Sequence, residues 1–237
     1  ARYVAANPRS AKLSGEAQGH LPGGNTRTTV HFSPFPLYIA KGEGSRLTDV
    51  DGHSYIDFIN EYTAGVFGHS NALIAETISR TIAQGLNFGA PTEHEVKLSA
   101  ELRKRFPAME LLRFCNSGTE ANLLAAATAR AVSRKDTIMI FNGAYHGSVF
   151  YFSHGPSPLN MPFPVITSTF NDPEKAASDI AKHGGKLAAV IVEPMQGGAG
   201  ALPATPAFIA ALRDVTERHG VLLIFDEVMT SRVQFGG

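Results

Sequence analysis

Short segments that are apolar throughout alternate with helical segments over the second half of the chain. A strand with two apolar faces has to be covered on both sides, which happens when helices pack on both faces of a parallel sheet. The lengths fit, since strands have about four to eight residues and helices about ten or more. The sequence therefore predicts an α/β fold with a mostly parallel sheet flanked by helices. We expect strands at residues 137–141, 165–169, 188–192 and 221–225, and helices at 173–183 and 206–219.

A strand, a tight turn and a helix are predicted just before this region. Leu111–Cys115 has strand length, Ser117–Thr119 forms the turn, and the Ala- and Leu-rich residues 121–132 form the helix. The first backbone N–H groups of a helix have no partner within it, and the positive end of its dipole favours an anion such as phosphate. Gly118 would let a ligand approach the backbone, and the hydroxyls of Ser117 and Thr119 would add hydrogen bonds. An ordinary capped helix has the same pattern.

Polar residues follow each expected strand, and in open α/β sheets ligands bind beyond the carboxyl ends of the strands. Asp226 follows the strand at 221–225, which we expect in the middle of the sheet, so its carboxylate should enter a largely dry pocket. A buried carboxylate must be paired or take up a proton. A protonated aromatic nitrogen is a suitable partner, as in the pyridinium of pyridoxal phosphate (PLP). A metal ligand or a structural Asp is the alternative, although the sequence contains no His/Cys/Asp cluster with metal-ligand spacing.

The first third of the chain predicts a different architecture. An N-terminal helix is broken by Leu21–Asn25, and three short strands separated by glycine turns predict a meander. Arg27, in a β-favouring stretch at 26–31, is either a surface residue or a clamp for a substrate carboxylate. We expect helices at 10–20, 72–85 and 92–106, strands at 37–40, 46–49 and 55–59, an irregular loop at 61–69, and a second long loop at 153–164.

Composition excludes several classes of protein. The 237 residues are 43% hydrophobic and 18% charged with a formal net charge of zero, which does not favour nucleic acid or a membrane surface as a partner. No apolar run approaches the ~20 residues that span a bilayer, and the first residues lack the apolar core of a signal peptide. The single Cys115 cannot form an internal disulfide, which fits a reducing compartment. We expect a cytoplasmic protein with a small-molecule site.

Four motifs follow one another along the chain: FCNSGTEAN (114–122), GAYHG (143–147), VEPMQG (192–197) and FDEVMT (225–230), extended by LPGGNTR (21–27) and FINEYTAGVFGH (58–69). Together they resemble the successive signatures of class III PLP-dependent aminotransferases, which have PLP fold type I. Their order and spacing match across about half of the chain, and within the family the chain looks nearest to β-amino-acid (β-phenylalanine) aminotransferases and glutamate-1-semialdehyde aminomutase.

The resemblance implies a cofactor site for PLP or pyridoxamine phosphate (PMP). Ser117, Gly118 and Thr119 would hold the phosphate, and Asp226 would pair with the ring nitrogen. Tyr145 would stack on one face of the ring and Val228 would press on the other. The remaining pocket-lining residues would be His146, Glu193 and Gln196.

It also implies a reaction between an amino acid and a 2-keto acid, in a homodimer with active sites at the subunit interface. Arg27 would bind the substrate carboxylate, with Tyr62 beside it or reaching in from a partner subunit. Residues 1–66 would form an N-terminal helix and β-meander segment that contributes to the small domain. Residues 67–237 would form an incomplete large cofactor-binding domain.

One required residue of that family is missing. The family's cofactor-binding lysine follows the matched aspartate by a few tens of residues, whereas all lysines of this chain precede Asp226. We therefore expect the chain to be part of a longer enzyme whose C-terminal part carries the lysine. A glutamate-1-semialdehyde-type aminomutase and a non-catalytic, lysine-free PLP- or PMP-binding fragment are the alternatives. The lysines are Lys12, Lys41, Lys97, Lys104, Lys135, Lys175, Lys182 and Lys186.

Overall fold

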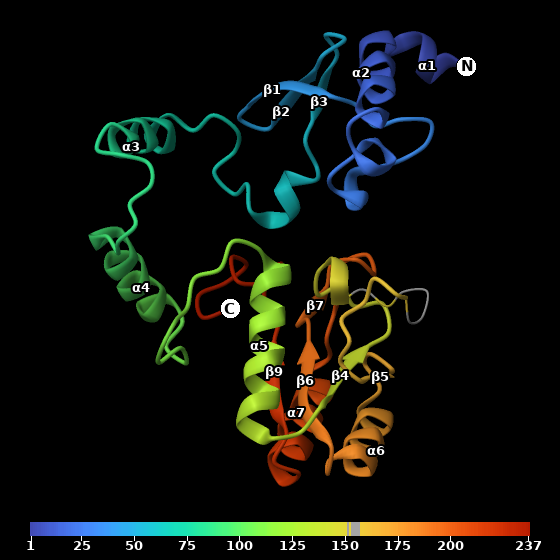
Figure 1. The fold of residues 1–237 in the computed structure, drawn as a ribbon, viewed down its shortest axis with the longest axis vertical. Coiled ribbons are helices and arrows are strands. Elements are labelled where there is room, and N and C mark those ends of the chain that lie inside the picture. The colour runs from blue at the N-terminus through green and yellow to red at the C-terminus, as the bar shows by residue number, and fades with distance from the viewer. Residues whose placement is uncertain (151, 153–156) are drawn as a thin grey trace. The chain divides into compact units, whose positions relative to one another are not determined.

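The computed structural model describes residues 1–150, 152 and 157–237. The chain forms two compact units, residues 1–91 and 92–237, which are described in turn (Figure 1). The domain division at residue 66 stays a prediction. Among the described helices, none is long and apolar enough to cross a membrane.

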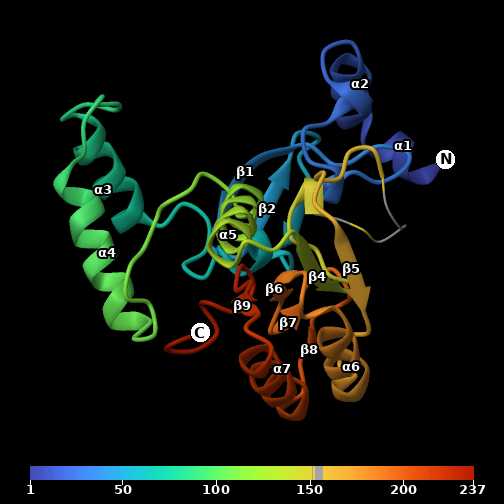
Figure 2. The ribbon, with the colours of Figure 1, turned by 60° about the horizontal axis from the view of Figure 1, so that its bottom comes forward.

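The second unit is built on a four-stranded parallel sheet with the strand order β5-β4-β6-β9. Its strands are β4 (Thr137–Phe141), β5 (Val165–Ser168), β6 (Leu187–Val192) and β9 (Leu222–Phe225). Helix α5 (Gly118–Ser133) lies on one face of the sheet, and α6 (Pro173–His183) with α7 (Pro206–Arg218) on the other, as Figure 2 shows. The predicted α/β fold with a parallel sheet flanked by helices is confirmed.

Neighbouring residues of the central strands enter different cores, as the alternation of side chains along a strand requires. Ile138 and Ile140 of β4 pack in one apolar cluster with Ala126 of α5. Met139 and Phe141 pack in the other, with residues of α6 and α7. Both faces of β4 and β6 are completely buried, which explains why these strands are apolar throughout.

The first unit contains the predicted meander, an antiparallel sheet of β1 (Ile39–Glu43), β2 (Arg46–Asp49) and β3 (Ser54–Ile56). Helices α1 (Arg2–Ala6) and α2 (Pro8–Gln18) precede it. Asp51, in the turn after β2, accepts hydrogen bonds from the backbone amides of Arg9 (2.7 Å) and Ser10 (3.0 Å). This carboxylate therefore caps the start of α2 from a distant part of the chain.

The remaining elements are short or little buried. Helix α3 (Ala72–Ile82) has the predicted apolar face, but none of its residues is buried, and Leu73 is 72% exposed. The others are α4 (Glu93–Arg105), the antiparallel pair β7 (Met195–Gln196) and β8 (Leu202–Pro203), and 3₁₀ helices at Pro22–Gly24, Thr28–Val30, Asn60–Thr63 and Ser148–Phe150.

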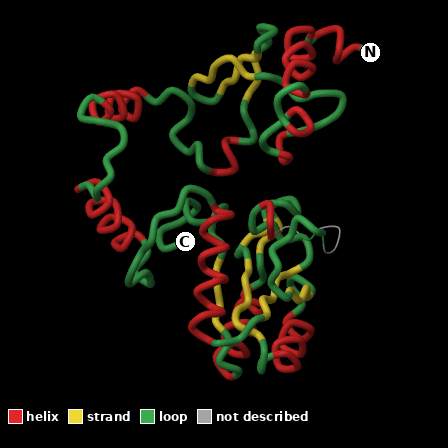
Figure 3. The backbone as a smooth tube through the Cα atoms, in the orientation of Figure 1, coloured by secondary structure: helices red, strands yellow, loops and turns green. Residues whose placement is uncertain are grey.

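Three local predictions are wrong. Leu111–Cys115 is not a strand but part of the loop before α5 (Figure 3), because no described strand pairs with its backbone and Leu111 is 92% exposed. The β-favouring stretch at 26–31 contains the 3₁₀ helix Thr28–Val30. The strand expected in the middle of the sheet is β9, which lies at an edge of the described sheet.

Of the loop predicted at 153–164, residues 153–156 lie outside the described residues, and 157–164 contain no helix or strand.

A cluster of phenylalanines lies between the sheet and helices α6 and α7, and its contribution to stability can be tested. Phe208 of α7 is fully buried, and its ring centroid lies 5.1 Å from that of Phe141 and 5.3 Å from that of Phe170. We expect Phe208→Ala to lower the free energy of unfolding by about 3–5 kcal/mol, measured by urea denaturation, because it leaves a cavity. The control is Leu159→Ala at a residue that is 81% exposed, which should change stability by less than about 0.5 kcal/mol. Equal effects of the two substitutions would contradict the assigned core.

The stability of the first unit should decrease at acid pH because of Asp49. Burial raises the pKa of this carboxyl, but hydrogen bonds from His53 and Tyr55 outweigh burial and hold its pKa below the ordinary value. Asp49 therefore stabilises the fold above its unfolded pKa of about 4, and this contribution is lost as the pH falls through the lower folded pKa. Asp49→Asn should be destabilising at pH 7, and the difference from the unsubstituted chain should shrink below about pH 4. Urea titrations at several pH values test this, with the exposed Asp214→Asn as control; a difference independent of pH would refute it.

Candidate functional site

The start of α5 presents backbone N–H groups that have no acceptor among the described residues. Ser117 is the N-cap, and its Oγ accepts a hydrogen bond from the Glu120 amide (3.2 Å), while its carbonyl accepts one from Ala121 (3.0 Å). In the part of the chain that the structure describes, no acceptor hydrogen-bonds the amides of Gly118 and Thr119. Together with the helix dipole, these two amides form a seat suited to an anion.

Two loops pack against this seat. Thr119 Oγ1 accepts a hydrogen bond from the Ser148 amide (3.3 Å), which attaches the loop after β4 to the first turn of α5. Gly147 has a φ of +107°, and a Cβ at this position would lie 2.3 Å from Thr119 Oγ1, so only glycine fits there. A Cβ on Gly118 would lie 3.2 Å from Val228, which follows β9. The structure thus brings Thr119, Gly147 and Val228 to one place.

Asp226 lies directly after β9 and is 7% exposed. Its Oδ2 accepts a hydrogen bond from Asn122 Nδ2 (2.8 Å) and lies 2.8 Å from His146 Nδ1. Its Oδ1 accepts one from the Val228 amide (3.1 Å). Although β9 is an edge strand here, contacts with α5 and the loop after β4 keep the carboxylate dry. The predicted burial of Asp226 is therefore correct, but its cause is not the central position that we expected.

Asp226 is an anion in spite of this burial. Burial raises the pKa of its carboxyl, but the hydrogen bonds from His146, Asn122 and Val228 outweigh burial and hold the pKa below its ordinary value. Because Oδ2 is an acceptor, His146 Nδ1 carries the proton of that contact. Within the described ranges, no group of three or more His, Cys, Asp or Glu residues could hold a metal ion.

Glu193 connects two loops at the same edge of the sheet. It lies directly after β6, and its oxygens accept hydrogen bonds from the backbone amides of Tyr145 (3.0 Å) and Gly197 (3.3 Å). Burial raises the pKa of Glu193, with the two amides acting in the opposite direction. Gln196 similarly donates from Nε2 to the Asn142 carbonyl (3.0 Å). Both side chains hold the backbone around Tyr145, whose own side chain is half-buried.

The two predicted substrate-binding residues belong to the first unit. Arg27 is exposed, directly before the 3₁₀ helix Thr28–Val30. Tyr62 is 38% exposed in the 3₁₀ helix Asn60–Thr63, whose four residues all have positive φ (46°, 50°, 55° and 75°). Such a run is rare for residues with side chains. The roles of Arg27 and Tyr62 stay predictions, as do those of the residues around Asp226.

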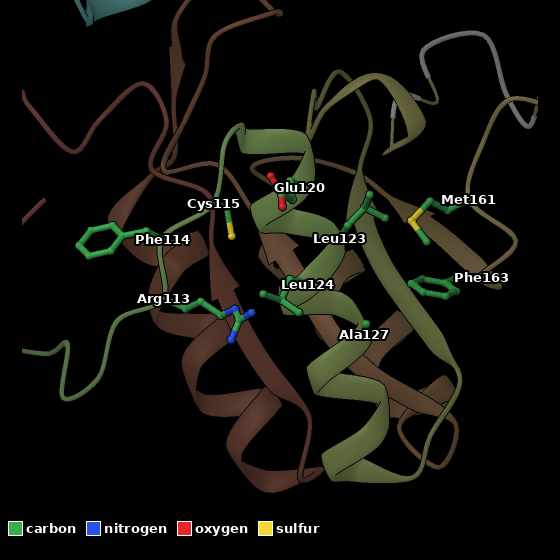
Figure 4. Close-up of a pocket in the computed structure, with 9 residues that line it drawn as sticks. All are labelled: Arg113, Phe114, Cys115, Glu120, Leu123, Leu124, Ala127, Met161 and Phe163. Carbon is green, nitrogen blue, oxygen red and sulfur yellow. The ribbon is translucent and has the colours of Figure 1, made fainter. Parts of the chain in front are cut away.

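A hollow of about 400 Å³ lies along α5, outside the predicted site (Figure 4). It contains neither the free amides of α5 nor Asp226. It is lined by Arg113, Phe114, Cys115, Glu120, Leu123, Leu124, Ala127, Met161 and Phe163.

Sequence reasoning assigned no role to Asn122, which contacts Asp226. A polar residue within a helix is usually solvated, and the spacing of four residues from Gly118 is the one signal that places it on the same face of α5. Glu120 was also missed. Its Oε2 accepts hydrogen bonds from the backbone amide (2.8 Å) and the side chain (3.1 Å) of Asn116, which orders the turn before Ser117.

Comparison with known proteins places this geometry in a family. Residues 28–233 match the sequence profile of the family described as Aminotransferase class-III. The β-phenylalanine transaminase of Variovorax paradoxus is 44% identical over 232 residues, which are 98% of this chain and 54% of that protein. Glutamate-1-semialdehyde 2,1-aminomutase 2 of Brevibacillus brevis is 40% identical, over 97% of this chain and 58% of the relative.

Solved structures agree with the sequence comparisons. The crystal structure of a β-phenylalanine aminotransferase from Variovorax paradoxus superposes with a TM-score of 0.93 over 98% of this chain and 54% of that one, at 44% identity. A structure described as a transaminase with PLP bound superposes with a TM-score of 0.91 at 36% identity, over 98% of this chain and 57% of that chain. The chain spans about half the length of the curated relatives it matches. On this sequence and structural evidence, the chain belongs to the class III aminotransferase family.

Proposed function

We propose that the protein is a PLP-dependent transaminase that moves an amino group between an amino acid and a 2-keto acid. The observation that carries the proposal is the buried, ionised Asp226 close to the free amides at the start of α5. The relative named β-phenylalanine transaminase supports a β-amino acid as the substrate class.

The residues present fit PLP or PMP at both ends. The amides of Gly118 and Thr119, with the hydroxyls of Ser117 and Thr119, would hold the phosphate at the positive end of α5. At the other end, Asp226 Oδ1 has one amide donor in the described chain and room for a further one, which the protonated ring nitrogen would supply. Tyr145 and Val228 would cover the two faces of the ring.

Bound PLP supplies an electron sink, and the power of that sink depends on a proton at its ring nitrogen. Asp226 would hold that proton in place, because an ionised carboxylate favours the protonated form of a neighbouring base. The amide seat would fix the phosphate, and Glu193 would keep the backbone of Tyr145 against the ring. Asp226 and Glu193 are both buried, so their carboxylates are shielded from bulk water.

The chemistry also needs a lysine, which we propose lies in a part of the protein beyond this chain. Lys186 directly precedes β6, at the end of the sheet opposite to Asp226. The chain would then be part of a longer, homodimeric, cytoplasmic enzyme in which Arg27 binds the substrate carboxylate and Tyr62 lies beside it. The aminomutase relative, at 40% identity, supports a second candidate, an aminomutase that returns the amino group to the same carbon skeleton.

Mass spectrometry of the purified full-length protein tests the proposed cofactor chemistry directly. After addition of PLP and reduction with borohydride, we expect an intact mass well above the 25.3 kDa of this chain, increased by one reduced pyridoxyl phosphate. A peptide map should place the adduct on a lysine that follows Asp226 in the sequence. A protein of 25.3 kDa without a specific adduct would leave only a binding fragment and refute the transaminase.

Kinetics of Arg27→Ala tests the substrate assignment. We expect kcat/KM for a β-amino acid to fall by about tenfold or more, because a hydrogen-bonded ion pair with the carboxylate is lost. An amine with the same skeleton but no carboxylate should react equally well with both proteins. The matched control is Arg46→Ala, at an exposed arginine of β2. Unchanged activity of Arg27→Ala on the β-amino acid would show that the carboxylate binds elsewhere.

Formation of the isomeric amino acid from glutamate semialdehyde, without a keto acid, would favour the aminomutase.

A further inference from the structure

The two oxygens of Asp226 have different environments. Oδ2 is contacted by Asn122 Nδ2 and by His146 Nδ1, both at 2.8 Å. Oδ1 has the Val228 amide at 3.1 Å as its one donor among the described residues. Each carboxylate oxygen accepts about two hydrogen bonds. Oδ2 is therefore fully used by the protein, and Oδ1 is the oxygen that can accept a further donor.

Asn122 holds this arrangement from inside α5. It is 6% exposed and lies four residues after Gly118, so the two residues are on the same face of the helix and about 6 Å apart along its axis. Its Nδ2 also donates to the backbone carbonyl of His146 (3.2 Å). Because both neighbours are acceptors, the NH₂ group faces them and both of its protons are used.

We propose that Asn122 is a positioning residue that directs Asp226 Oδ1 toward the ring nitrogen of the cofactor; this rests on the proposed function. With Oδ2 held by Asn122 and His146, the carboxylate cannot rotate freely and cannot turn its free position away. The hydrogen bond from Asn122 also makes the carboxylate a weaker base, so the shared proton stays on the ring nitrogen. The helix that seats the phosphate would thus also orient the group at the far end of the cofactor.

Binding of two ligands that differ at one atom tests this role. The full-length protein without cofactor is titrated calorimetrically with PMP and with its 1-deaza analogue, in which a CH group replaces the ring nitrogen. We expect Asn122→Ala to weaken PMP binding by about tenfold, because the affected hydrogen bond involves a charged group. Binding of the 1-deaza analogue should change by less than about twofold, since it has no proton to share with Asp226.

The control is Thr216→Val, which removes a fully buried hydroxyl that donates to the Leu212 carbonyl (2.6 Å) within α7. It should bind both ligands as the unsubstituted protein does. An equal loss of affinity for both ligands in Asn122→Ala would indicate general damage to the site and overturn the positioning role, and so would no loss for either. If the unsubstituted protein does not bind PMP, the proposed function fails, and this inference fails with it.

Asn122→Ala also leaves a cavity. A second variant of nearly the same shape as Asn122 therefore separates the loss of the hydrogen bond from the loss of packing. Asn122→Asp replaces the donor by a carboxyl that can donate to Asp226 only when it is protonated. We expect the ratio of its PMP dissociation constant to that of the unsubstituted protein to be near one at about pH 5 and to rise about tenfold by about pH 8. A ratio that does not change with pH would overturn the proposal.

Discussion

The geometry of the candidate site depends on the buried negative charge of Asp226. Removing a carboxylate from water costs several kcal/mol unless hydrogen bonds replace the lost hydration. At Asp226 the donors come from α5, from the loop after β4 and from the backbone after β9, so the charge is tolerated only when these three segments are correctly placed. The price is a site that cannot lose one donor without leaving an unpaired group. The same requirement makes the carboxylate a fixed, ionised acceptor.

The sequence predicted best the elements with clear local signals. The bounds of β4 and α6 agree with those expected, because an apolar strand of five residues and a helix that starts at Pro173 leave little choice. Leu111–Cys115 has the same local composition as a strand but lacks a described neighbour to pair with, and pairing is not visible in a local pattern. The order of strands in the sheet is equally non-local, which is why β9 was expected in the middle.

For the candidate site, the rule that ligands bind at the carboxyl ends of parallel strands grouped Tyr145, Glu193 and Asp226 correctly in space, because they follow β4, β6 and β9. Thr119 lies near them although the strand expected before it is a loop. The rule predicts where these residues lie but not which groups they hydrogen-bond. Glu193 was expected to line the pocket, yet both of its oxygens accept hydrogen bonds from backbone amides of loops whose conformation no periodic pattern describes. Asn122 was overlooked for a related reason, since the acceptor it serves lies 104 residues away in the sequence.

The two ends of the proposed cofactor site rely on different physics, and this difference determines which changes each end tolerates. The anion seat uses backbone amides and glycine, so its requirement is steric: at Gly147 a single added Cβ would collide with Thr119. The carboxylate end uses side chains in a low-dielectric environment, so its requirement is electrostatic. A substitution of similar size at this end alters the charge of the site and the position of the proton shared with Asp226. Helix α5 joins the two, because Gly118 and Asn122 are one turn apart on a rigid element. The separation between the seat and the carboxylate is therefore fixed by the rise of a helix, which a flexible loop could not provide.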